Sequence, residues 1–169
     1  ANTYLEKELT DKFGNIKAET PDQFLGANVH QSDDGIHLSH SAMIDRMAQK
    51  FFPHLDPSKV DVSKVKTPFP SHGSALGAEV KISDCPDIEN GEPTLNAPYR
   101  ELVGSLSYCA VTTRPDIAYY TSQLARVQSN PGEIHFKLAK HVLRYLMATR
   151  THGIMYRVKG TKVDKYIES

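Results

Sequence analysis

Residues 99–156 read YRELVGSLSYCAVTTRPDIAYYTSQLARVQSNPGEIHFKLAKHVLRYLMATRTHGIMY, and this stretch decides the fold. Apolar residues recur there at three- and four-residue spacing in three successive segments, which predicts three helices that each bury one face. The first helix starts at Tyr99 and stops before Arg114-Pro115, because a residue that precedes proline disfavours the helical conformation. For the last helix, which reaches about Thr149, the sequence predicts Asn130 as cap, Pro131 at the first position and Glu133 in a capping box.

The same region is strongly cationic. Residues 96–160 hold nine lysines or arginines and three acidic residues, a net charge of about +6, in a chain whose formal net charge is zero. Residues 1–95 carry the opposite excess, with nine basic and fifteen acidic residues. Such charge asymmetry between the two halves of a chain favours a polyanionic partner for the basic half.

Composition places the chain among ordinary globular proteins. Its 169 residues are enough for one good core, or for two small cores joined by a linker. No window approaches the ~20 apolar residues of a membrane span, so we expect no membrane partner. Two cysteines, Cys85 and Cys109, form no disulfide framework, and we therefore expect a reducing intracellular compartment, the cytoplasm or the nucleus.

The N-terminal part predicts a helix, a hairpin and a second helix. Leu5, Leu9 and Phe13 form an apolar stripe over residues 2–13, and Gly14 ends that helix. Residues 24–38 form two extended runs on either side of an Asp-Gly turn signal at 32–35, and this pattern predicts a β-hairpin. Ser39 or Ser41 is predicted to cap the next helix, whose apolar stripe is Met43, Ile44, Met47, Ala48 and Phe51.

These elements predict an α+β fold in three parts. Residues 1–52 hold the helix and hairpin unit, and 53–97 form an irregular connector rich in proline and glycine, which is a linker, a wrapping arm or a disordered segment. Residues 98–169 form a helical unit with two terminal strand pieces, at 154–159 and 162–167.

Catalytic patterns are sparse. The acidic pair Asp33-Asp34 lies in the predicted turn, and we expect a solvated hairpin tip there. His37 and His40 lack the further ligands that a zinc site needs, and Cys109 falls on an apolar helix face. We therefore predict no catalytic residue, no metal site and no cofactor, and no enzyme activity of this chain alone.

Two helix faces favour nucleic-acid binding. On the last helix, Lys137, Lys140, His141 and Arg144 project from one side, as phosphate contacts require, although a merely solvated cationic face is the alternative. On the first, Arg100, Gly104 and Tyr108 lie opposite the apolar stripe. A glycine inside a helix costs ~1 kcal/mol relative to alanine, so close approach of a ligand or close helix packing has to explain Gly104.

Several motifs resemble one family. The runs at 99–108 (YRELVGSLSY), 112–117 (TTRPDI) and 129–146 (SNPGEIHFKLAKHVLRYL) resemble the motifs YRxLVGSLxYL, TRPDI and SNPxxxHWxAxKRxLRYL. These belong to the pol polyproteins of Ty1/copia-type retrotransposons. Upstream, 24–38 resembles FLGxxIxxxxxGIxLSQ and 65–68 resembles VxTPL, so that the resemblance is collinear over nearly the whole chain. Phe136 stands where the family has tryptophan.

The resemblance implies the segment of a reverse transcriptase from the end of the palm through the thumb and connection, before the RNase H domain. The family's polymerase carboxylates would precede residue 1 and its RNase H carboxylates would follow Ser169. Phe24, Leu25 and Gly26 match the position of the primer grip. The helix with Arg100, Gly104 and Tyr108 is similar to the thumb helix that lies in the minor groove of the template–primer duplex.

We therefore expect a non-catalytic portion of a reverse transcriptase that binds an RNA–DNA or DNA duplex through its backbone and minor groove. Its other partner would be the rest of the pol polyprotein. The alternative is a domesticated fragment that acts as a protein-interaction or dimerisation module, including as a homodimer, through the apolar faces of the thumb-like unit.

Overall fold

The computed structural model describes residues 2–14, 22–55, 65–70, 79–90, 92 and 95–157. The elements follow in the order α1 (Asn2–Phe13), β1 (Gln23–Phe24), β2 (Ala27–Ser32), β3 (Gly35–Ser39), α2 (Ser41–Phe51), η3 (Ile82–Asp84), α3 (Tyr99–Thr112), η4 (Pro115–Ile117), α4 (Ala118–Ala125), α5 (Glu133–Ala148) and β4 (Gly153–Arg157). The α+β prediction is confirmed. None of the helices seen in the described residues has the length and apolar character of a membrane span.

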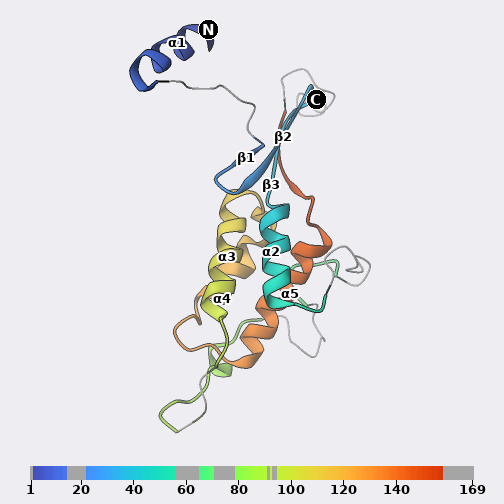
Figure 1. Cartoon of the computed structure of the whole chain (residues 1–169). Coiled ribbons are helices and arrows are strands. Elements are labelled where there is room, and N and C mark those ends of the chain that lie inside the picture. The colour runs from blue at the N-terminus through green and yellow to red at the C-terminus, as the bar shows by residue number, and fades with distance from the viewer. Residues whose placement is uncertain are drawn as a thin grey trace, which may run out of the picture.

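The strands form one antiparallel sheet in the order β1-β2-β3-β4, at one end of the helices in Figure 1. The predicted hairpin is confirmed, since Ser32 pairs with Gly35 across its turn. Gly35 has φ +143°, and a Cβ there would collide with the Tyr156 carbonyl, so this position requires glycine. The predicted strand piece at 154–159 is β4, which pairs with β3, whereas the piece predicted at 162–167 lies outside the described residues.

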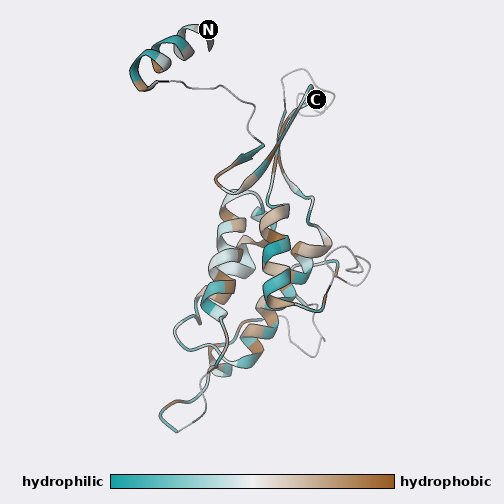
Figure 2. Ribbon diagram, in the orientation of Figure 1, coloured by the Kyte–Doolittle hydropathy of each residue, from teal (hydrophilic) through white to brown (hydrophobic). Residues whose placement is uncertain are grey.

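Helices α2, α3, α4 and α5 share one core. Its buried members come from these helices, η4 and the connector and include Ile44, Met47, Phe51, Phe69, Leu102, Leu106, Ile117, Leu124, Leu138, Leu143 and Leu146. In Figure 2, hydrophobic and hydrophilic bands alternate along α2 and α5, as amphipathic helices require. Phe136, which replaces the tryptophan of the resembled motif, packs edge-to-face on Phe51 with ring centroids 6.4 Å apart. The pairing of β4 with β3 and this core thus join residues 133–157 to β3 and α2.

The described part of the connector is irregular apart from η3, and it lies against the helices. Phe69 is buried and stacks on Tyr120 with ring centroids 4.7 Å apart. His135 Nε2 lies 2.9 Å from the Lys81 carbonyl oxygen, and Asn130 Nδ2 donates to the Pro86 carbonyl at 2.8 Å. The described residues of the connector therefore contact the helical core.

Two predicted caps are wrong. The N-cap of α2 is His40, and Asn28 Oδ1 in β2 accepts a hydrogen bond from the Ala42 N–H and another from the Ser41 hydroxyl. The last helix starts at Glu133 after Gly132, so neither Asn130 nor Pro131 occupies its predicted position. Asn130 instead holds the connector, and His135 Nδ1 accepts from the Gly132 N–H. Asn28 and Asn130 thus bond to partners 14 and 44 residues away in the sequence, whereas the His135 bond to Gly132 is local.

A buried arginine joins three helical elements just after α3. The guanidinium of Arg114 donates to both carboxylate oxygens of Asp116, at 2.9 and 2.7 Å, and to the Thr149 carbonyl and hydroxyl, at 3.0 and 2.7 Å. Tyr145 donates to the same carboxylate at 2.9 Å. Partial burial raises the pKa of Asp116, but hydrogen bonds and the charge of Arg114 outweigh it, so this pKa lies below its ordinary value. Arg114 therefore links the end of α3 to η4 and to the end of α5.

We expect Arg114→Ala to lower the free energy of unfolding by about 3 kcal/mol, because it removes a buried charge partner and leaves several polar groups without their donor. Urea unfolding followed by circular dichroism measures the change. Arg126→Ala is the matched control, since Arg126 is exposed and its guanidinium bonds to Gln123 on the same helix, and it should change the value by less than ~0.5 kcal/mol. Equal effects of the two substitutions would contradict a structural role for Arg114.

Candidate nucleic-acid interface

The outer face of α3 is exposed along its length. Arg100 and Gly104 are exposed, Tyr108 is 39% exposed and Val111 is 86% exposed. Their spacing of three and four residues places them on one side of the helix, while Leu102 and Leu106 on the other side are fully buried. The structure thus places the predicted residues on one continuous surface and adds Val111, which the sequence analysis did not select.

Gly104 lies on this surface without a neighbour. A Cβ built at this position meets no atom of the described residues within 4 Å, and its φ is not positive. Gly132 and Gly153 differ, because a Cβ there would collide with the carbonyl oxygens of Asp84 and Leu38. Close helix packing therefore does not account for Gly104 within the described part of the chain.

The turn between β1 and β2 lies against the same helix. Phe24 and Leu25 are 62% and 74% exposed at this turn, and Leu25 adopts a positive φ of 49°. The Tyr108 hydroxyl donates a hydrogen bond to the Leu25 carbonyl oxygen. The structure therefore brings Phe24, Leu25 and Gly26 together with the α3 face, although 83 residues separate the two hydrogen-bonded residues.

A buried histidine lies beside Tyr108. The His40 ring is fully buried and meets the Tyr108 ring edge-to-face, with centroids 5.4 Å apart. Its Nδ1 lies 2.7 Å from Thr113 Oγ1, while its Nε2 has no hydrogen-bond partner in the described structure. Burial lowers the pKa of His40, so the ring is neutral at pH 7.

The cations of α5 share one side of the helix, but their surroundings differ. Lys137 is exposed and lies 3.7 Å from the Glu133 carboxylate. Lys140 and Arg144 are half-buried and both lie over the Phe52 ring, at 5.3 and 5.0 Å from its centroid. Both side chains thus cover apolar surface while their charged ends remain at the surface of the helix.

His141 differs from the other members of this side. Its Nε2 lies 3.3 Å from the Thr67 carbonyl oxygen in the connector. Burial lowers the pKa of His141, the Thr67 hydrogen bond opposes that shift, and the charge of Arg144 adds to it. The net pKa lies below the ordinary value, so His141 adds no positive charge at pH 7 and the side presents three cations.

The groups that suggested catalysis lie apart from one another. The described residues contain no group of three His, Cys, Asp or Glu side chains that could hold a metal ion. Asp33 and Asp34 are exposed in the hairpin turn. Cys109 is buried, and burial raises the pKa of its thiol to about 11, which makes it a poor nucleophile at neutral pH.

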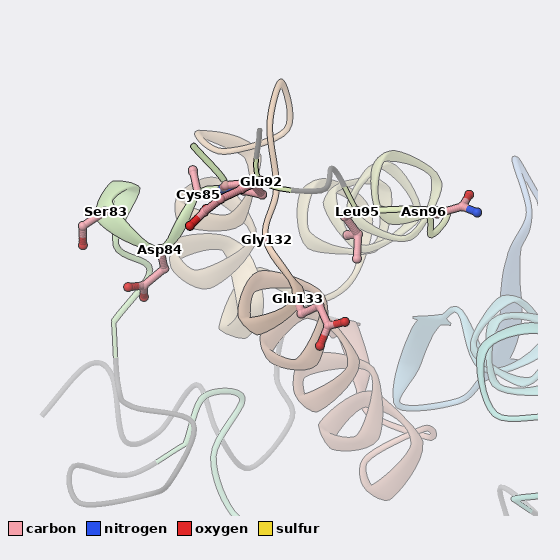
Figure 3. A pocket seen from close by; sticks show the side chains of 9 residues that line it. Ser83, Asp84, Cys85, Glu92, Leu95, Asn96, Gly132 and Glu133 are labelled. Carbon is pink, nitrogen blue, oxygen red and sulfur yellow. The ribbon is translucent and has the colours of Figure 1, made fainter. Parts of the chain in front are cut away.

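A hollow of about 750 Å³ lies where the connector meets the start of α5. Figure 3 shows its lining, in which Asp84, Glu92 and Glu133 are acidic and Cys85 contributes a thiol. Burial and the charge of Asp84 raise the pKa of Cys85. A hollow with three carboxylates is unsuited to a polyanion, so the candidate interface is the α3 face with the adjoining turn.

Comparison with known proteins relates the chain to retrotransposons. It is 34% identical over 157 residues to a putative transposon Ty5-1 protein of Saccharomyces cerevisiae, which covers 90% of this chain and 45% of that protein. It is 30% identical over 150 residues to the retrovirus-related Pol polyprotein from transposon TNT 1-94 of Nicotiana tabacum, covering 86% of this chain and 10% of that protein. A shorter match, 41% identical over 66 residues, is to a secreted RxLR effector protein of Plasmopara viticola, covering 39% of this chain and 46% of that protein.

The homologues are therefore Ty/copia-type retrotransposon Pol proteins, and the chain is similar to a segment of them. It spans less than half the length of each of these three relatives. No protein-family model matches the sequence, and no solved structure matches it.

His40 makes stability depend on pH. Because its pKa is lower in the folded state than the ordinary value of about 6.5, the unfolded chain binds protons first, and stability falls as the pH drops below about 6.5. His141 acts in the same direction. We expect a lower free energy of unfolding at pH 5.5 than at pH 7.5, and a smaller difference for His40→Gln. His30→Gln, which changes an exposed histidine, should keep the wild-type difference. An unaltered pH dependence in His40→Gln would contradict this assignment.

Proposed function

We propose that this chain, whose homologues are retrotransposon Pol proteins, is the duplex-binding, non-catalytic thumb and connection portion of a reverse transcriptase. It holds the template–primer duplex by the backbone and the minor groove, without reading base sequence. The catalytic carboxylates belong to other parts of such an enzyme, and this chain alone is inactive as a polymerase.

The observation that carries the proposal is Gly104. It lies in the middle of an exposed helix face, it costs ~1 kcal/mol of helix stability relative to alanine, and no described atom needs the space above it. A ligand backbone that lies directly on the helix does need that space. Arg100 on one side supplies positive charge for phosphates, and the Tyr108 ring on the other supplies a flat surface for sugars.

The turn at Phe24–Gly26 extends this surface. Two exposed apolar side chains beside a helix face with an exposed glycine suit the sugar edges of a shallow minor groove, where hydrogen-bonding patterns are degenerate. On α5, Lys137, Lys140 and Arg144 add a second positively charged side that suits phosphates further along the backbone.

A second candidate is a protein-interaction or dimerisation module. It is favoured by the exposed apolar side chains of Phe24, Leu25 and Val111, which lie in or beside the same surface. The match to a secreted effector protein over part of the chain is consistent with reuse of this segment outside Pol proteins. In that case sedimentation shows a homodimer at micromolar concentration, and duplex binding is weak and unaffected by substitutions at Gly104.

Substitution of Gly104 tests the proposal. Gly104→Ala should raise the free energy of unfolding by about 0.5–1 kcal/mol through helix propensity, because the added methyl group meets open space. The same change should weaken binding of a fluorescent RNA–DNA duplex about fivefold, and Gly104→Leu should weaken it further, in titrations followed by anisotropy.

Gln49→Ala, at an exposed position of α2, is the matched control, in which helix propensity improves and duplex affinity should not change. Leu106→Ala, by contrast, should cost ~2–5 kcal/mol of stability as a buried truncation. If Gly104→Ala and Gly104→Leu both bind like the wild type, the duplex does not approach this helix.

Salt dependence tests the cations of α5. A triple variant with Lys137→Gln, Lys140→Met and Arg144→Met removes three charges and keeps apolar cover over Phe52. The slope of log affinity against log salt should decrease by about 1 for every removed cation that binds a phosphate in the wild type. A variant with Lys7→Gln, Lys12→Met and Arg46→Met has the same change in net charge at exposed positions elsewhere. Equal slopes for the two variants would leave only a non-specific charge effect.

A further inference from the structure

We infer that Tyr108 is a positioning residue, whose hydroxyl holds the turn at Phe24–Gly26 against α3 so that both halves of the binding surface keep one geometry. The inference rests on the proposed function for its consequence in binding. The hydrogen bond from Tyr108 to the Leu25 carbonyl oxygen links these two halves directly. Without it, a short turn with exposed side chains would move independently of the helix.

The turn is held in a conformation that a free chain seldom adopts. Leu25 has φ +49° and Gly26 has φ +79°, and the left-handed region is unfavourable for a leucine. Leu25 is 74% exposed, so burial of its side chain does not compensate for the strain. The pairing of Phe24 with Ala27 closes this turn, and the Tyr108 hydroxyl links it to α3 through the Leu25 carbonyl oxygen.

Tyr108 is itself held in place by the buried side chain that its ring contacts. Its ring meets the buried His40 ring edge-to-face, and His40 Nδ1 lies 2.7 Å from Thr113 Oγ1. Thr113 directly precedes Arg114, which anchors the end of α3. The turn is thus connected through Tyr108 and His40 to the buried junction at Arg114. A surface held in this way is preorganised, which lowers the entropy cost of binding.

The sequence predicts Tyr108 as a contact residue for the duplex. In the structure its hydroxyl already donates to a partner inside the protein, so that its hydrogen is not free to bond to the duplex, whereas the ring is partly exposed. Tyr108→Phe therefore separates the two roles, since it removes the hydroxyl and keeps the ring against His40.

The first measurement uses the protein without nucleic acid. In Tyr108→Phe, we expect the amides of residues 24–27 to exchange with deuterated solvent about three- to tenfold faster, as the loss of one hydrogen bond implies. The melting temperature should stay within ~2 °C of the wild type. Tyr119→Phe, at an exposed tyrosine of α4, is the matched control and should leave exchange at the turn unaltered. Unaltered exchange in Tyr108→Phe would overturn the inference.

The second measurement is a double-mutant cycle on duplex affinity. Tyr108→Phe should weaken binding of the RNA–DNA duplex about threefold or more in the wild-type background. In a Phe24→Ala, Leu25→Ala background the turn no longer reaches the duplex, and Tyr108→Phe should have no further effect. An equal weakening in both backgrounds means that the hydroxyl contacts the duplex directly, and unaltered affinity in the wild-type background means that turn position is irrelevant. Either result overturns the inference.

If the wild type itself binds no duplex, the proposed function fails, whereas the exchange experiment still decides whether Tyr108 holds the turn.

Discussion

The guanidinium of Arg114 donates four hydrogen bonds at the point where α3, η4 and α5 meet, and the residue is only 1% exposed. A buried charge with these partners tolerates little displacement, because any broken bond leaves a polar group without water. The position of α3 relative to α5 is therefore set at this end, while apolar packing sets the rest. Thr113, the next residue toward α3, extends the same junction to His40 at the start of α2.

This junction holds α3 in one orientation, so that its exposed side chains form a single surface. The helix cannot rotate about its axis without breaking the bonds of Arg114, so Arg100, Gly104 and Val111 keep facing outward. The turn between β1 and β2 is bound to the same helix through Tyr108, and β4 follows α5 and pairs with β3. Elements that lie far apart in the sequence thus support one face.

The glycines differ in what requires them. Gly35, Gly132 and Gly153 each lie against a backbone carbonyl that a Cβ would strike, so the fold accounts for all three. Gly104 has ordinary helical geometry and open space above it. The charged residues do not divide in this way, since Lys140 and Arg144 cover aromatic rings and Arg100 Nε donates to the Gln128 carbonyl oxygen at 3.0 Å. Gly104 is thus a residue of the exposed face for which the described fold shows no requirement.

The sequence by itself determined the elements that local chemistry controls: the helices, the Asp-Gly hairpin, the break at Arg114-Pro115 and the buried side of α2, α3, α4 and α5, whereas Phe13 of the stripe predicted for α1 is exposed. Spacing also placed Arg100, Gly104 and Tyr108 on one face, because helical periodicity needs no tertiary information. Only the tertiary structure decided the bond from Asn28 to the start of α2, the bond from Asn130 to Pro86, the burial of Arg114 and the bond from Tyr108 to Leu25. Each of these depends on partners or surroundings that residue spacing along one element does not specify. Such contacts arise from how the elements pack, and periodicity within a helix or strand carries no record of them.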